Sequence, residues 1–176
     1  WWCAEGGGAH GVPFTQCNVR QQHHGIQYLV EVRGANARIA VIRAAEETLD
    51  LLRLNGIEYV ADWVIDDLPQ DIATPHGTIT TIPYSVETND IVIHALQHLP
   101  SEQFLKRCTD QFDRLYLEGA TNARIMAISV HPYITGVPHR IKYLEALLDY
   151  VLGHDGVALM TASEIGDWYR AEMAKN

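Results

Sequence analysis

The chain has 176 residues, 47% of them hydrophobic, and a formal net charge of −9 at pH 7. This size is enough for one domain with a real core, and no run of eighteen apolar residues predicts a membrane span. The acidic balance argues against nucleic acid as a partner, because phosphate contacts need clustered lysine and arginine. The three cysteines form no Cys-x-x-Cys pair and leave one unpaired, so we expect a reducing, cytoplasmic compartment.

The first 24 residues show neither a helical nor a strand period. Glycines 6–8 and the polar run Gln21-Gln22-His23-His24 are typical of loops, so residues 1–24 are expected to be an irregular N-terminal segment. From residue 25 the pattern becomes regular, and residues 25–176 are expected to form a single α/β domain.

The regular part alternates between apolar runs typical of strands and amphipathic runs typical of helices. In chain order the pattern predicts strands over 26–32 and 37–42, a helix over 44–55 ended by Gly56, a strand over 57–61, a hairpin of 72–74 with 78–82, helices over 90–99 and 101–118, a strand over 125–130, a helix over 140–152, a strand over 156–160, and a last helix opened by a capping box at Thr161 and Glu164. Strands that alternate with helices imply a largely parallel sheet or part of a barrel.

In two of the predicted strands, a residue with a reactive side chain follows directly after the apolar run. The run 125–130 ends at His131, and Pro132 prevents further ladder pairing because it has no backbone donor. An earlier strand ends at Asp62, which Trp63 follows. A carboxylate and an imidazole at the open ends of parallel strands indicate an acid–base site, because α/β folds bind ligands there. We expect His131 and Asp62 to face one concave pocket.

Several short sequence words occur in a fixed order between about residues 48 and 169. The words are Thr48-Leu49-Asp50-Leu51-Leu52, Tyr59-Val60-Ala61-Asp62-Trp63, Asp66-Asp67-Leu68-Pro69, Ile82-Pro83-Tyr84-Ser85-Val86-Glu87-Thr88-Asn89-Asp90, Ser129-Val130-His131-Pro132-Tyr133, Gly136, Pro138-His139-Arg140, His154-Asp155-Gly156-Val157 and Glu164-Ile165. Together they resemble the C-terminal half of polysaccharide deacetylases, the family 4 carbohydrate esterases. The resemblance is closest to the branch that includes bacterial allantoinases and cyclic-imide hydrolases.

This resemblance implies a fold and a set of catalytic residues. The implied fold is a distorted or partial (β/α) barrel of the deacetylase type, from which the family's first strands are missing here. By the family pattern His131 protonates the leaving amine of an amide, and Asp62 orients a catalytic arginine. Arg43 and Arg38 are the candidates for that arginine, and Arg43, five residues before Thr48, has the better spacing. The same pattern implies a substrate-binding set, which consists of Trp63, Tyr84, Asn89 and Asp90.

The metal-binding words of the family are absent from the chain. Members of the family usually bind a divalent metal such as zinc through an Asp-Asp strand and an H-x-x-x-H pair. The histidines that stand four residues apart, His94 and His98, fall on a predicted amphipathic helix in another region. We therefore expect no family-type metal in the pocket. The identity of any cofactor is left open.

The expected site residues also have ordinary structural interpretations. His131 could be a buried histidine that bonds a backbone carbonyl group. Asp62 could cap a turn, as aspartate often does after a strand. Asn89 and Asp90 could cap the helix that follows them.

Three functions therefore remain open at this stage. The first is a deacetylase-like hydrolase of a non-peptide carbon–nitrogen bond, acting on a carbohydrate. The second is a hydrolase of a small cyclic amide or ureide, of the allantoinase or imidase type. The third is an inactive half-domain that acts as a subunit or binds sugar. A sheet without its opening strands leaves an unpaired edge, so we expect a homo-oligomer or a second chain that completes the barrel.

Overall fold

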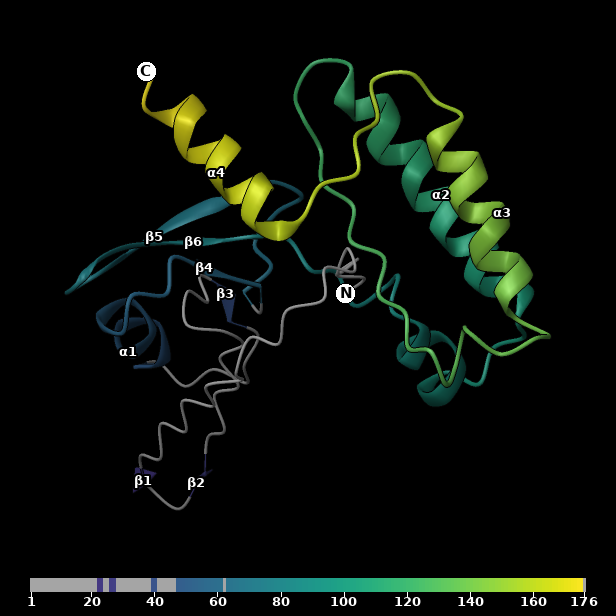
Figure 1. Ribbon diagram of the computed structural model, residues 1–176, viewed down its shortest axis with the longest axis horizontal. Coiled ribbons are helices and arrows are strands. Elements are labelled where there is room, and N and C mark those ends of the chain that lie inside the picture. Colours follow the sequence, from purple (N-terminus) through teal and green to yellow (C-terminus); the bar gives the residue numbers. More distant parts are fainter. Residues whose placement is uncertain (1–21, 24–25, 28–38, 41–46, 62, 176) are drawn as a thin grey trace, which may run out of the picture. The chain divides into compact units, whose positions relative to one another are not determined.

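A computed structural model describes residues 22–23, 26–27, 39–40, 47–61 and 63–175 (Figure 1). The described chain divides into two compact units, which we call the helical unit and the sheet unit. The helical unit is Tyr84–Leu159, and the sheet unit combines the described residues up to Pro83 with residues 160–175. No helix in the described part of the chain is long and apolar enough to cross a membrane.

The sheet unit contains a small, mainly parallel sheet. Its strands are β3 (Ile39–Ala40), β4 (Tyr59–Val60), β5 (Gln70–Thr74) and β6 (Gly77–Thr81), in the spatial order β3-β4-β6-β5. Both β3 and β6 pair with β4 in parallel, whereas β5 and β6 form an antiparallel hairpin. The expected hairpin and the expected parallel pairing are therefore both confirmed. A separate two-stranded ladder joins β1 (Gln22–His23) to β2 (Ile26–Gln27).

Strand β4 sends its two side chains to opposite faces of the sheet, as the period of two requires. Val60 joins a buried apolar cluster with helix α1 (Thr48–Leu54). Tyr59 is instead bonded to helix α4 (Ala162–Met173), through Asp167. Figure 1 shows α1 and α4 on opposite faces of this sheet. The sheet unit is therefore a three-layer α/β/α arrangement.

Helix α4 docks on the sheet around the ring of Tyr59, which is fully buried. The Tyr59 hydroxyl donates to Asp167 Oδ1 at 2.7 Å, and the guanidinium of Arg170 lies 4.7 Å from the ring centroid. Gly166 faces the ring, and a Cβ atom there would lie 2.3 Å from Tyr59 Cε1. Because carbon atoms normally approach to about 3.5–4.0 Å, only glycine allows this contact.

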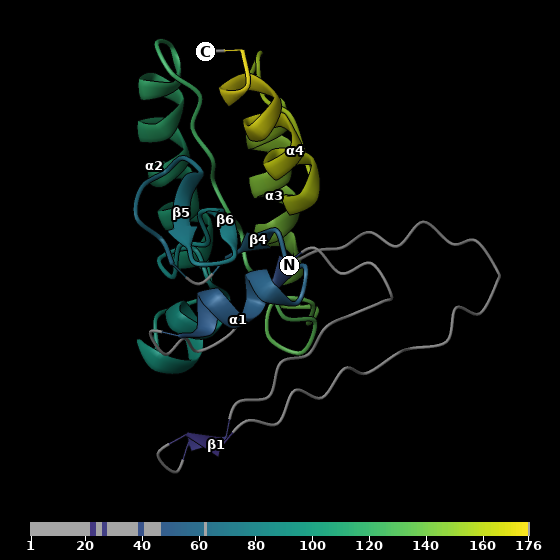
Figure 2. The same ribbon diagram turned by 90° about the vertical axis from the view of Figure 1, so that its left-hand side faces the viewer.

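The helical unit consists of η1 (Ile91–Leu96), α2 (Glu102–Gly119) and α3 (Ile141–Leu152). Figure 1 shows α2 and α3 side by side, and Figure 2 shows the stretch after α2 running back along that helix before α3 begins. The two helices run in the same direction. Tyr150 of α3 donates to Asp113 of α2, and one turn further on, His154, just after α3, lies against Tyr116 of α2. Their shared core is Ile93, Phe104, Cys108, Phe112, Leu147 and Val151.

Two of the expected strands are wrong, over residues 125–130 and 156–160. Residues 125–130 form no strand, and within the described residues their strand-like pairing is a single parallel bridge between Ser129 and Asn89. Residues 156–160 likewise form no strand, and Leu159 and Met160 there are 68% and 44% exposed. An apolar run indicates burial, but a strand also needs a partner that accepts and donates along its length.

The helix expected over 90–99 also differs in type. It is a six-residue π-helix, in which the N–H of Gln97 donates to the carbonyl of Val92 at 2.9 Å, five residues back. His98, with φ of 53°, then occupies the left-handed region and ends it. Single-turn π-helices are rare and often occur at functional sites, and this one begins directly after Asp90.

Candidate functional site

A buried carboxylate, Asp90, is hydrogen-bonded to a partly exposed imidazole, His131, in the helical unit. The Nδ1 atom of His131 lies 2.6 Å from Oδ1 of Asp90, and the backbone N–H of His131 donates to Asp90 Oδ2 at 2.7 Å. The hydroxyl of Thr135 donates to the same Oδ2 atom, also at 2.7 Å. The Asp90 side chain is 0% exposed, whereas 32% of the His131 side chain is exposed. A buried carboxylate needs such donors, because an unpaired buried charge is very costly.

A tight turn presents His131 and Thr135 to Asp90 together. The backbone N–H of Thr135 donates to the carbonyl oxygen of His131 at 2.9 Å, which closes the turn. Gly136 follows directly, and a Cβ atom at that position would lie 2.5 Å from the carbonyl oxygen of Pro132. A larger residue at 136 would therefore force the turn apart. The geometry of the pair depends on this glycine.

A second segment brings Asp90 beside that turn. Asn89 and Ser129 form an isolated parallel bridge. In it the N–H of Asp90 donates to the carbonyl of Ser129 at 3.0 Å, and the N–H of Ser129 donates to the carbonyl of Thr88 at 3.3 Å. The bridge holds the backbone of Asp90 next to the chain that leads into His131. Two segments distant in sequence thus meet at the pair.

The pairing assigns the proton on the imidazole ring. An ionised carboxylate only accepts hydrogen bonds, so the geometry assigns the proton of the neutral ring to Nδ1 of His131, facing Asp90. The other ring nitrogen, Nε2, is then the one that can exchange a proton with a ligand. A partly exposed imidazole held in one tautomer by a buried carboxylate can act as a general acid or a general base.

Two tyrosines and an asparagine surround the pair. The ring of Tyr133 lies 5.4 Å from that of His131, centroid to centroid, and Tyr133 is 70% exposed. The side-chain amide of Asn89 donates to the hydroxyl of Tyr84 at 3.3 Å. Tyr84, Asn89, Asp90 and His131, which the sequence analysis assigned to the site, are therefore all in one unit. Tyr133 adds an exposed aromatic surface beside the imidazole.

Asn89 caps the helix that follows it, whereas Asp90 does not. Asn89 Oδ1 accepts from the N–H of Ile91 at 2.9 Å, so Asn89 caps the first turn of η1, as the capping interpretation expected. Asp90 has no side-chain cap bond and is committed to His131 and Thr135. The family resemblance places Asp90 in the substrate-binding set, and the structure shows its side chain fully buried. Its part in substrate binding stays a prediction.

The remaining site residues belong to the sheet unit or lie outside the described residues. Trp63 is in the sheet unit, is 36% exposed, and accepts a hydrogen bond through its carbonyl from the hydroxyl of Thr81. Asp62 and Arg43 lie outside the described residues. The shared pocket of His131 and Asp62, and the role of Arg43, therefore stay predictions.

Thr135 is the site residue that the sequence analysis missed. It is 2% exposed, and its hydroxyl bond to Asp90 is buried. Thr135 follows His131 by four residues, and Gly136 comes next. This spacing was the signal in the sequence, because a tight turn before Gly136 brings both side chains to one place. A threonine in a turn is ordinarily read as a local backbone-bonding residue, which hides a long-range role.

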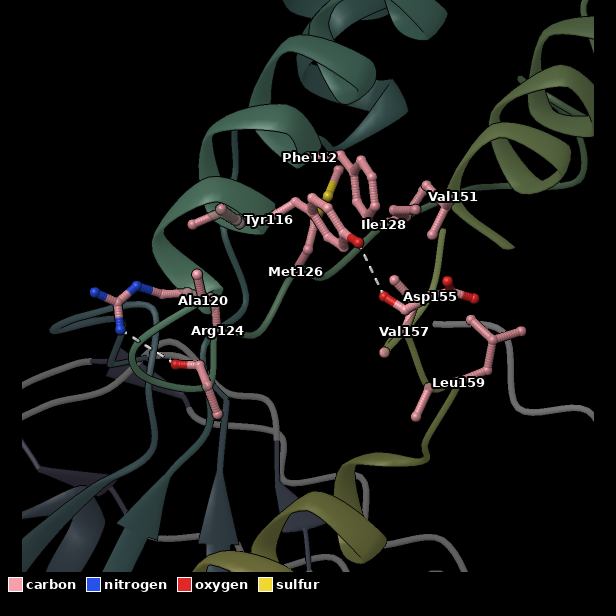
Figure 3. Close-up of a pocket in the computed structure, with 15 residues that line it drawn as sticks. Phe112, Tyr116, Ala120, Arg124, Met126, Ile128, Val151, Asp155, Val157 and Leu159 are labelled. Atoms are coloured by element: carbon pink, nitrogen blue, oxygen red, sulfur yellow. Dashed lines mark hydrogen bonds between the residues drawn. The ribbon is translucent and has the colours of Figure 1, made fainter. Parts of the chain in front are cut away.

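A separate groove lies in the helical unit between α2 and the residues after α3 (Figure 3). It has a volume of about 470 Å³, and Phe112, Met126, Ile128 and Leu159 are among its lining residues. Neither Asp90 nor His131 lines it. In Figure 3 the side chains of Met126 and Ile128, from one segment expected to be a strand, and of Val157 and Leu159, from the other, line the same opening.

The described residues do not assemble a metal site of the family kind. Among them no three His, Cys, Asp or Glu side chains gather as metal ligands, and the Nδ1 atom of His131 is bonded to Asp90. A catalytic zinc needs about three protein ligands.

Comparisons with known proteins give the site a context, although no family model matches the chain. A Schizosaccharomyces pombe protein assigned by name to the polysaccharide deacetylases is 30% identical over 123 residues, which are 64% of this chain and 38% of that protein. A structure from Pseudomonas aeruginosa PAO1, with the same assignment, is 33% identical with a TM-score of 0.66, over 73% of this chain and 44% of that one.

Two further solved structures are also similar. The Puue allantoinase is 28% identical with a TM-score of 0.68, over 73% of this chain and 44% of that chain. A Mycobacterium smegmatis structure, 19% identical with a TM-score of 0.64 over 74% of this chain and 47% of that chain, shows the same fold. These comparisons confirm the resemblance to polysaccharide deacetylases, with an allantoinase among the similar structures. The chain spans less than half the length of each of these relatives.

Proposed function

We propose that this chain supplies the acid–base part of a hydrolase that cleaves a non-peptide carbon–nitrogen amide bond, of the polysaccharide deacetylase type. The observation that carries the proposal is the buried Asp90 carboxylate bonded to a partly exposed His131. A carboxylate buried at this cost, and directed at one imidazole, is typical of a site whose proton transfers are controlled.

Hydrolysis of an amide requires a proton for the departing nitrogen, because an amide anion is a very poor leaving group. In the proposed reaction Nε2 of His131 donates that proton to the nitrogen as the carbon–nitrogen bond breaks. Asp90 holds the ring through Nδ1 and stabilises the imidazolium form before the transfer. The attacking water must also lose a proton to a base, which we do not assign. We propose that Asp62 orients Arg43 in the same site.

The substrate would lie against the exposed side of the imidazole. Tyr133 offers an aromatic face there, of the kind on which a sugar ring or a small heterocycle stacks. Tyr84 and Asn89 are bonded to each other next to Asp90 and are proposed to contact the substrate. Trp63 is proposed as a further pocket wall.

A second candidate function is hydrolysis of a small cyclic amide or ureide. The similarity to the Puue allantoinase favours it, since the TM-score of 0.68 is as high as that for the Pseudomonas aeruginosa deacetylase structure. The same proton donor serves both reactions, because ring opening also leaves a nitrogen that must be protonated. The two functions differ in substrate and share His131.

We also propose that the two units form part of a (β/α) barrel that further polypeptide completes, from a homo-oligomer or from a second chain. The exposed apolar side chains of Leu159 and Met160 and the groove of Figure 3 support this, because such surface is normally covered. The third candidate function, an inactive half-domain that acts as a subunit or binds sugar, depends on the same surface.

The test compares three forms of the intact gene product on two kinds of substrate. One assay measures acetate released from an N-acetylated chitooligosaccharide, and the other measures ring opening of allantoin, hydantoin and succinimide. His131→Gln is expected to lower kcat by about 10²- to 10⁴-fold, whereas His139→Gln, at an exposed position of the same unit, serves as the matched control.

Each result has a separate meaning. Acetate release that depends on His131 supports the deacetylase function, and ring opening that depends on it supports the second function. Equal rates for the two histidine variants would contradict the role of His131. No turnover on either kind of substrate would contradict the hydrolase proposal and favour the inactive half-domain.

A further inference from the structure

We propose that Thr135 is a positioning residue, which fixes the Asp90 carboxylate and through it the tautomer of His131. This inference rests on the proposed function for its effect on rate, but its structural part stands on geometry alone. The hydroxyl of Thr135 donates to Asp90 Oδ2 at 2.7 Å inside the helical unit, and Thr135 is 2% exposed.

The two oxygens of the Asp90 carboxylate have different hydrogen-bond partners. Oδ1 faces the ring nitrogen of His131, whereas Oδ2 accepts from the backbone N–H of His131 and from the hydroxyl of Thr135. The two donors on Oδ2 come from different points of one turn, so together they fix the plane of the carboxylate. With only the backbone donor, the carboxylate could rotate about its last bond and Oδ1 would no longer be held toward Nδ1.

Thr135 is itself held firmly enough to do this. Its backbone N–H donates to the carbonyl of His131 at 2.9 Å, and Arg140 donates to the carbonyl of Ile134 at 3.2 Å. The side chain is thus fixed by the same turn that presents the imidazole. Because a threonine has few rotamers, its hydroxyl is directed at Asp90 with little loss of entropy.

Losing the hydroxyl should reduce turnover without reducing substrate binding. Removal of one partner of a hydrogen bond to a buried charged group is expected to lower the rate by about tenfold to one hundredfold. Since Thr135 touches Asp90 and not the substrate, the loss is expected in kcat, with KM nearly unchanged. The ring of His131 should also lose its preference for the tautomer with the proton on Nδ1.

The experiment compares Thr135→Val, which keeps the shape but removes the hydroxyl, with Thr135→Ser, which restores a hydroxyl. The readout is the nitrogen-15 NMR spectrum of the histidine rings in the intact protein, recorded where the rings are neutral, together with kcat and KM. Thr88→Val is the matched control, because Thr88 is equally buried but its hydroxyl donates to the carbonyl of Ala127.

We expect a mixed tautomer of His131 in Thr135→Val, and the Nδ1–H tautomer in Thr135→Ser and in Thr88→Val. A single unchanged tautomer in Thr135→Val would overturn the inference, even if the variant were less stable, because lower stability alone does not alter the ring of the folded protein. If the tautomer responds as expected but His131→Gln keeps full activity, Thr135 positions the ring as inferred and the proposed function fails separately.

Discussion

Substitution of Gly166 by alanine tests how α4 docks on the sheet unit. The added Cβ atom would lie 2.3 Å from Cε1, 2.5 Å from Cζ and 2.6 Å from Cδ1 of Tyr59. To reach an ordinary carbon–carbon contact of about 3.5 Å, the ring or the helix must move by about 1 Å. That movement would strain the 2.7 Å hydrogen bond to Asp167 and the contact with Arg170.

The expected cost follows from opposing terms. Overpacking of this kind costs about 1–3 kcal/mol, and a weakened hydrogen bond adds about 1 kcal/mol. Alanine recovers about 1 kcal/mol through its helix propensity. We therefore expect Gly166→Ala to lose about 2 kcal/mol of unfolding free energy, and Tm to fall by about 4–8 °C at this chain length.

The assay is thermal and urea unfolding followed by near-ultraviolet circular dichroism, which reports the packing of aromatic rings. Gly119→Ala is the matched control, because Gly119 is also a helical residue and a Cβ atom there would meet nothing within 4 Å. The control is expected to be as stable as the parent chain or slightly more stable. Equal stability of the two variants would refute the docking contact between Gly166 and Tyr59.

Three further predictions concern single side chains. Burial raises the pKa of the Cys108 thiol to about 12, so iodoacetamide at pH 8 should modify Cys108 only after urea unfolds the chain, as peptide mass spectrometry would show. Thr161→Ala should lower the unfolding free energy by about 1 kcal/mol in a urea titration, because Thr161 and Glu164 form a reciprocal capping box. Asp113 raises the pKa of Tyr150 by accepting the hydrogen bond of its phenol, so Asp113→Asn should lower that pKa in an ultraviolet titration.

Each of these outcomes can fail independently. Rapid labelling of Cys108 in the native chain would mean that the core around it opens easily. An unchanged urea midpoint for Thr161→Ala would show that the start of α4 is held by its docking and not by its cap. An equal pKa of Tyr150 in Asp113→Asn and in the parent chain would contradict the hydrogen bond between α2 and α3.

The features that the sequence predicted well depend on neighbours in the chain. The turn at Pro75-His76-Gly77 predicted the hairpin of β5 and β6, and Gly77 there has φ of 107°, which suits glycine. Gly56, expected just after a helix, has φ of 83° two residues beyond the end of α1. The capping box at Thr161 is present as expected. In each case a local backbone requirement selects the residue type.

The features that the sequence did not predict depend on partners far away in the chain. The run 125–130 is apolar enough for a buried strand, but nothing in it states which segment pairs with it, and only the bridge at Ser129 forms among the described residues. The hydrogen bonds of Asp90 were not predicted for the same reason, since its partners His131 and Thr135 follow 41 and 45 residues later. The resemblance proposes His131 as a catalytic residue, and the structure shows that Asp90 is its hydrogen-bond partner.

The long separation between Asp90 and its three donors has a consequence for how the protein folds. Helix α2 lies within the segment that separates Asp90 from His131. Closing a flexible loop of this length would cost about 3 kcal/mol of chain entropy. Prior formation of α2 makes the loop shorter and stiffer, which lowers that cost. Formation of the pair should therefore follow collapse of the helical core in refolding. The His131 ring signal should reach its native form later than helical circular dichroism does.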